Sequence, residues 1–200
     1  MKRLLFFLLL MPLLTACPPG KDSGEDIVKN FRKNGYNMLP VNKHGYKKIT
    51  FKLPESMEMD YSSHYTYKSD AYRYREHNIG IIFSIERFTE DDLYSTMMED
   101  FIIEDDLLNS FHDAYVDRRL GSLHEGGASF KKDVRKNVKF PGTIQVVSGQ
   151  SSSGSELLYY ATATLKVEKE YYLFQFICDK PMMDYVYDDF ERILASVRKK

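Results

Sequence analysis

The histidines, carboxylates and serines of this chain could in principle perform acid–base, metal or nucleophilic chemistry. Their spacing matches no known motif for any of these three kinds of chemistry. No two of the five histidines stand in an HExxH or other close metal-ligand spacing. The acidic runs at 90–92, 104–106 and 188–189 lack the glycine of an EF-hand loop. In "SGQSSSGSE" the residue at 153 is Ser, so the G-x-S-x-G pattern of a nucleophile elbow is absent. We therefore predict no catalytic residue, no metal site and no cofactor.

The stretch "HYTYKSDAYRYRE", residues 64–76, is the strongest candidate for binding. Side chains alternate between the two faces of a strand, so Tyr65 and Tyr67 share one face, and Tyr72 and Tyr74 share a face of the next strand. Arg73 and Arg75 point the opposite way from Tyr72 and Tyr74. One interpretation is an aromatic platform for a glycan or peptide, rimmed with basic residues. The other is an aromatic core made by cross-strand pairs, with solvated arginines. The candidate binding surface consists of Tyr65, Tyr67, Tyr72, Arg73, Tyr74 and Arg75.

The first 17 residues have the pattern of a secretory signal. Two cations, Lys2 and Arg3, precede eleven residues, Leu4 to Leu14, that are apolar apart from a neutral proline. Eleven helical residues span roughly 16 Å, about half of a bilayer core of ~30 Å. A processing signal therefore fits this segment better than a transmembrane helix does.

The residues Leu14-Thr15-Ala16-Cys17 resemble the lipobox of bacterial lipoproteins, Leu-x-Ala-Cys. The resemblance implies a diacylglyceryl group on the Cys17 sulfur, cleavage after Ala16 and acylation of the new amino terminus. It also implies that the chain is membrane-anchored in the bacterial cell envelope, with the leaflet and side left open. The alternative is an ordinary signal peptide that is cut elsewhere, with Cys17 incidental.

The remaining chain divides into a tether and one domain. "PPGKDSGED" is polar and rich in Pro and Gly, as flexible linkers are. We expect a signal peptide over 1–16, a lipidated cysteine and tether over 17–44, and a single domain over 45–200. Without the signal peptide, 26 Lys and Arg face 29 Asp and Glu, which excludes a polybasic nucleic-acid binder. If Cys17 carries lipid, Cys178 has no disulfide partner and is predicted to be a buried thiol.

Hydrophobic periodicity predicts an α+β fold with an antiparallel sheet. "YKKITFKL" alternates as a half-buried strand, and "IGIIFSIERF" is typical of a more buried one. Residues 91–119 have an interrupted helical pattern, and "ELLYYATATLKV" and "EYYLFQFIC" are close enough to form a hairpin. A C-terminal amphipathic helix is expected from Pro181 to Val197, packed on the sheet. Its apolar arc is Met183, Val186, Phe190, Ile193, Leu194 and Val197.

This order of elements is similar to the PsbP-like domain that the DcrB-like envelope lipoproteins share. The matching segments are "GYKKITFKLPESM", "LLYYATATLKVEKEYYLFQFIC" and "DDFERILASVR". The resemblance implies a sheet packed between helices and an accessory or binding role, with no catalytic residues to carry over. The expected function is a lipid-anchored, non-enzymatic envelope protein whose partner is an envelope protein or a glycan. The alternative is an enzyme that acts on envelope polymers, with a site assembled from scattered carboxylates and histidines.

Overall fold

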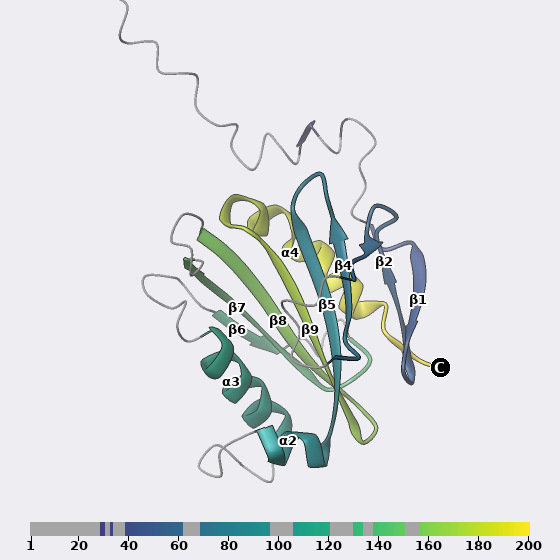
Figure 1. Cartoon of the computed structure of the whole chain (residues 1–200), viewed down its shortest axis with the longest axis vertical. Helices are drawn as coiled ribbons and strands as arrows, with labels where there is room; N and C mark the ends of the chain where they lie inside the picture. The colour runs from purple at the N-terminus through teal and green to yellow at the C-terminus, as the bar shows by residue number, and fades with distance from the viewer. Residues whose placement is uncertain are drawn as a thin grey trace, which may run out of the picture.

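The structure, a computed structural model, describes residues 29–30, 33, 39–61, 69–96, 106–120, 130–133, 138–150 and 157–200. Of the predicted site residues, Cys17, Tyr65 and Tyr67 lie outside these ranges, as does the whole predicted signal peptide. Figure 1 shows a broad twisted sheet in the middle of the molecule, with α3 on one side of it and α4 on the other.

A seven-stranded antiparallel sheet forms the centre of the fold, in the order β3-β4-β5-β9-β8-β7-β6. The predicted α+β class and the antiparallel sheet are therefore confirmed. The strands are β3 (Glu58–Met59), β4 (Tyr72–Glu76), β5 (Ile81–Thr89), β6 (Phe130–Asp133), β7 (Gly142–Gln150), β8 (Leu157–Val167) and β9 (Glu170–Asp179).

The hairpin of β8 and β9 is the longest local pairing and was predicted correctly. A two-residue turn joins the strands, and Val167 pairs with Glu170. Glu168 in this turn has a φ of 58°, in the left-handed region that two-residue hairpin turns need. Cys178 near the end of β9 is buried in the core, as predicted for a free thiol.

Both faces of β9 are buried, so the sheet needs a layer on each side. On one face Phe174 and Phe176 join a cluster with residues of α4 (Lys180–Ala195). On the other face Tyr171 and Leu173 join a cluster with residues of α2 (Glu90–Thr96) and α3 (Leu107–Leu120). The expected packing of the sheet between a helical middle segment and a C-terminal helix is confirmed, although residues 97–105 of that segment lie outside the described ranges.

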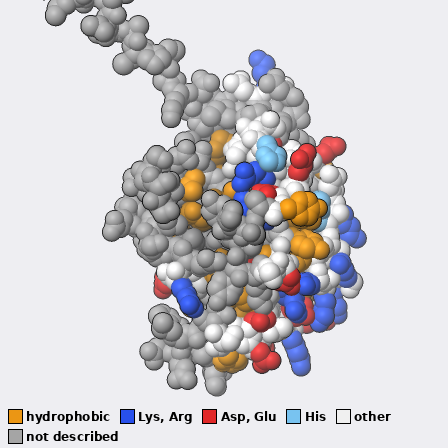
Figure 2. Space-filling model, viewed as in Figure 1, with side chains coloured by type: hydrophobic (Ala, Val, Ile, Leu, Met, Phe, Trp, Pro, Cys, Tyr) orange, Lys and Arg blue, Asp and Glu red, His pale blue; other side chains and the backbone are white. Residues whose placement is uncertain are grey.

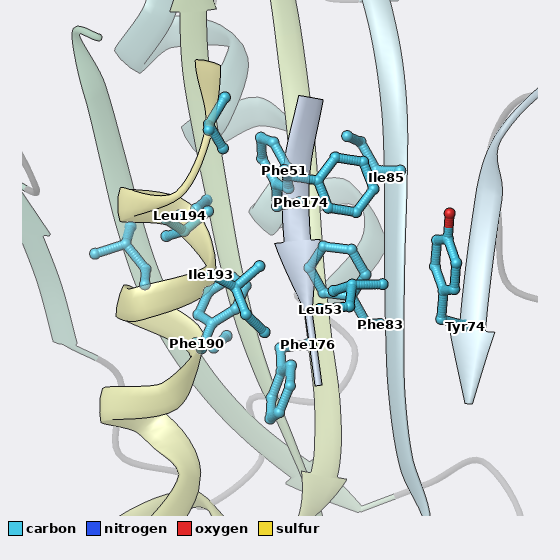
Figure 3. Packing of buried hydrophobic residues seen from close by; sticks show 14 of the residues in the cluster. Phe51, Leu53, Tyr74, Phe83, Ile85, Phe174, Phe176, Phe190, Ile193 and Leu194 are labelled. Atoms are coloured by element: carbon cyan, nitrogen blue, oxygen red, sulfur yellow. The ribbon is translucent and has the colours of Figure 1, made fainter. Parts of the chain in front are cut away.

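The amphipathic pattern of α4 is explained by its burial on the sheet. Phe190 is fully buried, and its ring centroid lies 5.3 Å from that of Phe176. In Figure 3, Phe190, Ile193 and Leu194 point from α4 toward the sheet. All six residues of the predicted arc are buried: Met183, Val186, Phe190, Ile193, Leu194 and Val197.

A second, three-stranded sheet in the order β1-β2-β10 lies on the same side of the large sheet as α4. It consists of β1 (Asn42–Tyr46), β2 (Ile49–Leu53) and β10 (Arg198–Lys199). The predicted alternation in β2 is confirmed, since Ile49, Phe51 and Leu53 are fully buried and Lys52 is exposed. Figure 3 shows Phe51 and Leu53 facing the aromatic residues of β5 and β9.

The first strand begins earlier than the sequence analysis placed the domain. β1 starts at Asn42, three positions before the predicted boundary at Gly45. The reason is that residues 42–44, which belong to the predicted tether, form backbone pairs with β2. The β10 strand was not anticipated either. The division into signal peptide, tether and domain otherwise stays a prediction.

Replacing Phe190 tests the packing of α4. We expect Phe190→Ala to lower the free energy of unfolding by ~3–5 kcal/mol, because a fully buried ring is lost and a cavity remains. Asp188→Ala, on the exposed side of the same helix, should change it by no more than about 0.5 kcal/mol. Urea unfolding of both variants measures the difference. Equal stabilities of the two variants would show that α4 is not packed as described.

Candidate binding surface at the β3–β4 edge

The four described residues of the candidate surface all belong to β4, and they have different surroundings. Tyr74 is only 2% exposed and lies in the main core, with its ring centroid 6.2 Å from that of Phe83. Tyr72, on the same face, is 37% exposed. Of the two tyrosines of the candidate surface that the structure describes, therefore, only Tyr72 is accessible to a partner.

The arginines on the opposite face of β4 are held by a carboxylate. The Arg73 Nη2 atom lies 3.0 Å from Asp60 Oδ2, and the Arg75 Nε atom lies 3.3 Å from the same oxygen. The backbone N–H of Asp60 also donates to the carbonyl of Arg73. Arg73 is buried, which corrects the interpretation that both arginines are solvated. Burial is tolerated because Asp60 supplies the opposite charge.

An exposed apolar surface lies at the open end of the large sheet. Met59 pairs with Tyr74, and this register places Tyr61 beside Tyr72 on the same face. The exposed fractions are 38% for Met59, 90% for Tyr61 and 37% for Tyr72. We call these three residues the aromatic edge. Figure 2 shows hydrophobic side chains on the right of the view, where β4 and β2 lie in Figure 1, bordered by charged side chains of both signs and by His.

Aromatic side chains of the small sheet pack against the inner side of the aromatic edge. The ring of Tyr46 from β1 lies 4.8 Å from that of Tyr72, and the ring of His44 lies 5.0 Å from that of Tyr74. Burial lowers the pKa of His44 and raises the pKa of Tyr74 to about 12. These shifts favour neutral side chains at pH 7. At the exposed surface itself, Tyr61 and Tyr72 present aromatic rings and phenol groups, which suit stacking and hydrogen bonding.

Two ionic contacts place the β1–β2 turn against the large sheet. Lys47 Nζ lies 2.6 Å from Asp70 Oδ2, close to the start of β4. Lys48 Nζ lies 2.9 Å from Glu170 Oε1 at the start of β9. The Lys47–Asp70 pair is exposed at both ends and contributes little stability alone, whereas the side chain of Glu170 is only 10% exposed, so its pair with Lys48 is screened less by solvent.

Glu170 is the most highly connected carboxylate among these contacts. Its Oε1 atom also accepts a hydrogen bond of 3.0 Å from Arg87, and its Oε2 atom accepts one of 2.6 Å from Tyr172. Burial alone would raise the pKa of Glu170, but the hydrogen bonds from Tyr172, Lys48 and Arg87 outweigh it and bring the pKa below its ordinary value. We call this group the Glu170 junction. The sequence analysis did not identify it, because its four residues come from three separate segments.

Metal-ligand clusters and membrane-spanning helices are both absent from the part of the chain that the structure describes. Within the ranges given above, no three His, Cys, Asp or Glu side chains lie together as metal ligands would. His112 is buried against β8, where its Nδ1 atom lies 3.0 Å from Thr164 Oγ1. No helix in the described ranges is long and apolar enough to cross a membrane.

Comparison with solved structures shows what this chain resembles in fold. It is similar to the Ran-binding protein Mog1p of Saccharomyces cerevisiae, with a TM-score of 0.54, 8% sequence identity, and coverage of 82% of this chain and 96% of Mog1p. A mutant of Mog1 gives a TM-score of 0.52 at 9% identity, covering 80% of this chain and 96% of the other. No protein-family model and no curated protein sequence matches the chain.

A PsbP structure is also among the similar folds. The cyanobacterial PsbP of Synechocystis sp. PCC 6803 gives a TM-score of 0.47 at 11% identity, covering 83% of this chain and 96% of that protein. We draw no conclusion from a score this low, so the PsbP-like resemblance stays a prediction from sequence order. At such identities the Mog1 comparison shows the fold alone, and fold does not fix function.

Proposed function

We propose that this chain is a lipid-anchored accessory protein of the bacterial cell envelope that binds a partner through the aromatic edge. The observation that carries the proposal is the exposure of Met59, Tyr61 and Tyr72 on a packed support. No catalytic step is part of this function.

The lipid anchor is supported by the lipobox-like residues that end in Cys17 and by the polar segment that follows them. Stable anchoring needs two membrane signals, and the expected lipoprotein carries both a diacylglyceryl group and an acylated amino terminus. β1, the first strand in the described residues, starts 25 positions after Cys17, which places it close to the expected anchor in sequence.

The binding role is supported by the chemistry of the aromatic edge. Tyrosine supplies a large contact area with few rotatable bonds, and it is enriched at the energetic centres of protein interfaces. Tyr72 is held by Tyr46, so part of the surface is already ordered before a partner binds. Mog1p, a protein of similar fold, is described as Ran-binding. An envelope protein or a glycan fits this surface, because both present groups that stack on rings and bond to phenols.

Lipidation of Cys17 is the first test. Expressed in a bacterial host, the wild-type chain should partition into detergent, and its N-terminal peptide should carry diacylglyceryl and acyl mass. Cys17→Ala removes the sulfur that accepts the lipid, so this variant should stay uncleaved or become soluble. Mass spectrometry measures both outcomes. Soluble wild-type protein without acyl mass would refute the anchor.

A photo-crosslinking residue at position 61 tests the binding surface. We expect a discrete crosslinked product in intact cells when the crosslinker replaces Tyr61, and none when it replaces Tyr94. Tyr94 is a matched control, because it is 45% exposed but lies on α2, in the layer on the other side of the large sheet.

The same product should weaken when Tyr72 is replaced. Truncating the centre of a protein interface typically costs ~2 kcal/mol or more, so we expect Tyr72→Ala to reduce crosslinking at position 61 by at least about tenfold. Identical products from positions 61 and 94, or a yield that Tyr72→Ala leaves unchanged, would show that the aromatic edge is not the binding surface.

A further inference from the structure

The outward face of the small sheet carries a group of lysine and arginine residues. Ile49, Phe51 and Leu53 of β2 point inward, so Lys52 points outward, and Lys43 of β1 is its direct cross-strand partner. Arg198 of β10 pairs with Thr50 on the same outward face. Lys200 reaches this face too, because its side chain lies 3.0 Å from the place where a Cβ on Gly45 would stand. We call Lys43, Lys52, Arg198 and Lys200 the cationic face.

The cationic face differs from the neighbouring lysines in having no carboxylate partners. Lys47, Lys48 and Lys199 form ion pairs with Asp70, Glu170 and Glu168. In the described part of the chain, none of the four residues of the cationic face forms an ion pair. Like charges directly opposite each other on two strands repel, so the pairing of Lys43 with Lys52 is unfavourable unless an anion lies over it.

The arrangement suits a flat anionic partner. Neighbouring strands lie about 4.8 Å apart, so the face presents its charges on a nearly flat surface. Arg198 is held in place because its Nη1 atom donates to the carbonyls of Ala195 and Val197. Val41, two positions before Lys43, is 53% exposed beside these charges. In Figure 2, several Lys and Arg side chains, with Asp and Glu among them, lie at the lower right, around the position that the C-terminus has in Figure 1.

We propose that the cationic face docks on an anionic lipid surface through phosphate headgroups. The proposal rests on the proposed lipid anchor, which would hold the domain close to the membrane and raise the effective concentration of headgroups. β1 carries Lys43 and is the first strand in the described part of the chain, so that part of the chain enters the sheets at this face. From residue 17 onward the chain has 26 Lys and Arg against 29 Asp and Glu, so the sharing of one face by Lys43, Lys52, Arg198 and Lys200 does not follow from an overall excess of cations.

Vesicle co-flotation tests the proposal directly. The protein is the mature chain, residues 17–200, with Cys17→Ser so that it carries no lipid; this chain contains every described helix and strand. We expect it to bind vesicles that contain phosphatidylglycerol and not vesicles of phosphatidylcholine alone. Binding should weaken as salt is added, because exposed charges are screened.

Two variants with the same change in net charge distinguish an effect of the cationic face on binding from an effect of the overall charge. Lys43→Gln/Lys52→Gln removes two cations from the face, and Arg118→Glu makes an equal change on α3, in the layer on the other side of the large sheet. Each cation near an anionic leaflet contributes about 1 kcal/mol, so the double variant should bind about thirtyfold more weakly. Arg118→Glu should bind like the parent chain. All three substituted side chains are exposed, so thermal melts should coincide.

Several outcomes would overturn the docking face. They are equal binding to both kinds of vesicle, unchanged binding by the double variant, and an equal loss in Arg118→Glu. Binding to a DNA oligonucleotide through Lys43 and Lys52, without binding to phosphatidylglycerol, would assign the face to nucleic acid instead. None of these results changes the acylation of Cys17 in cells, so failure of the docking face is distinguishable from failure of the anchor.

Discussion

The carboxylate of Glu170 is the polar contact that joins the small sheet to the large one, beside the buried apolar side chains of β2. It is 7% exposed and accepts hydrogen bonds from Tyr172 on its own strand, from Arg87 on β5 and from Lys48 in the β1–β2 turn. A carboxylate this buried is costly unless its charge is matched, and the three donors match it. The same contact therefore neutralises a buried charge and joins two sheets.

Both surfaces proposed to act in function belong to or rest on the small sheet. Its inner face brings Tyr46 under Tyr72 and so supports the aromatic edge. Its outer face is the cationic face, which begins with Lys43 on β1. A domain anchored at Cys17 and docked through this face would hold β1 near the membrane. The aromatic edge packs against the inner face of the small sheet, opposite the cationic face, so it would remain open to a partner.

The sequence predicted the elements whose patterns are long and regular, and it missed those fixed by distant contacts. The α4 helix was predicted correctly because its helical periodicity extends over many residues, and the β8–β9 hairpin because two long strand-like runs lie close together in sequence. β1 was missed because the turn Lys47–Lys48 has no Gly or Asn, although Lys47 adopts a φ of 50° there. The burial of Arg73 could not be predicted, because its partner Asp60 lies on another segment and shows no local pattern. The exposed Tyr61 beside Tyr72 was likewise visible only once the strand register was known.

Amide hydrogen exchange of Glu170→Gln tests the central claim, that this carboxylate holds the small sheet on the large one. Of the three donors, only Lys48 belongs to the small sheet. A hydrogen bond to a charged group contributes about 1.5–3 kcal/mol, so loss of the Lys48 contact should let the small sheet open separately from the rest of the domain. We predict that the amides of β1, β2 and β10 exchange at least about tenfold faster in the variant at neutral pH, while protection in β7 and β8 is unchanged. Unchanged protection in the small sheet, or an equal loss across both sheets, would contradict this account.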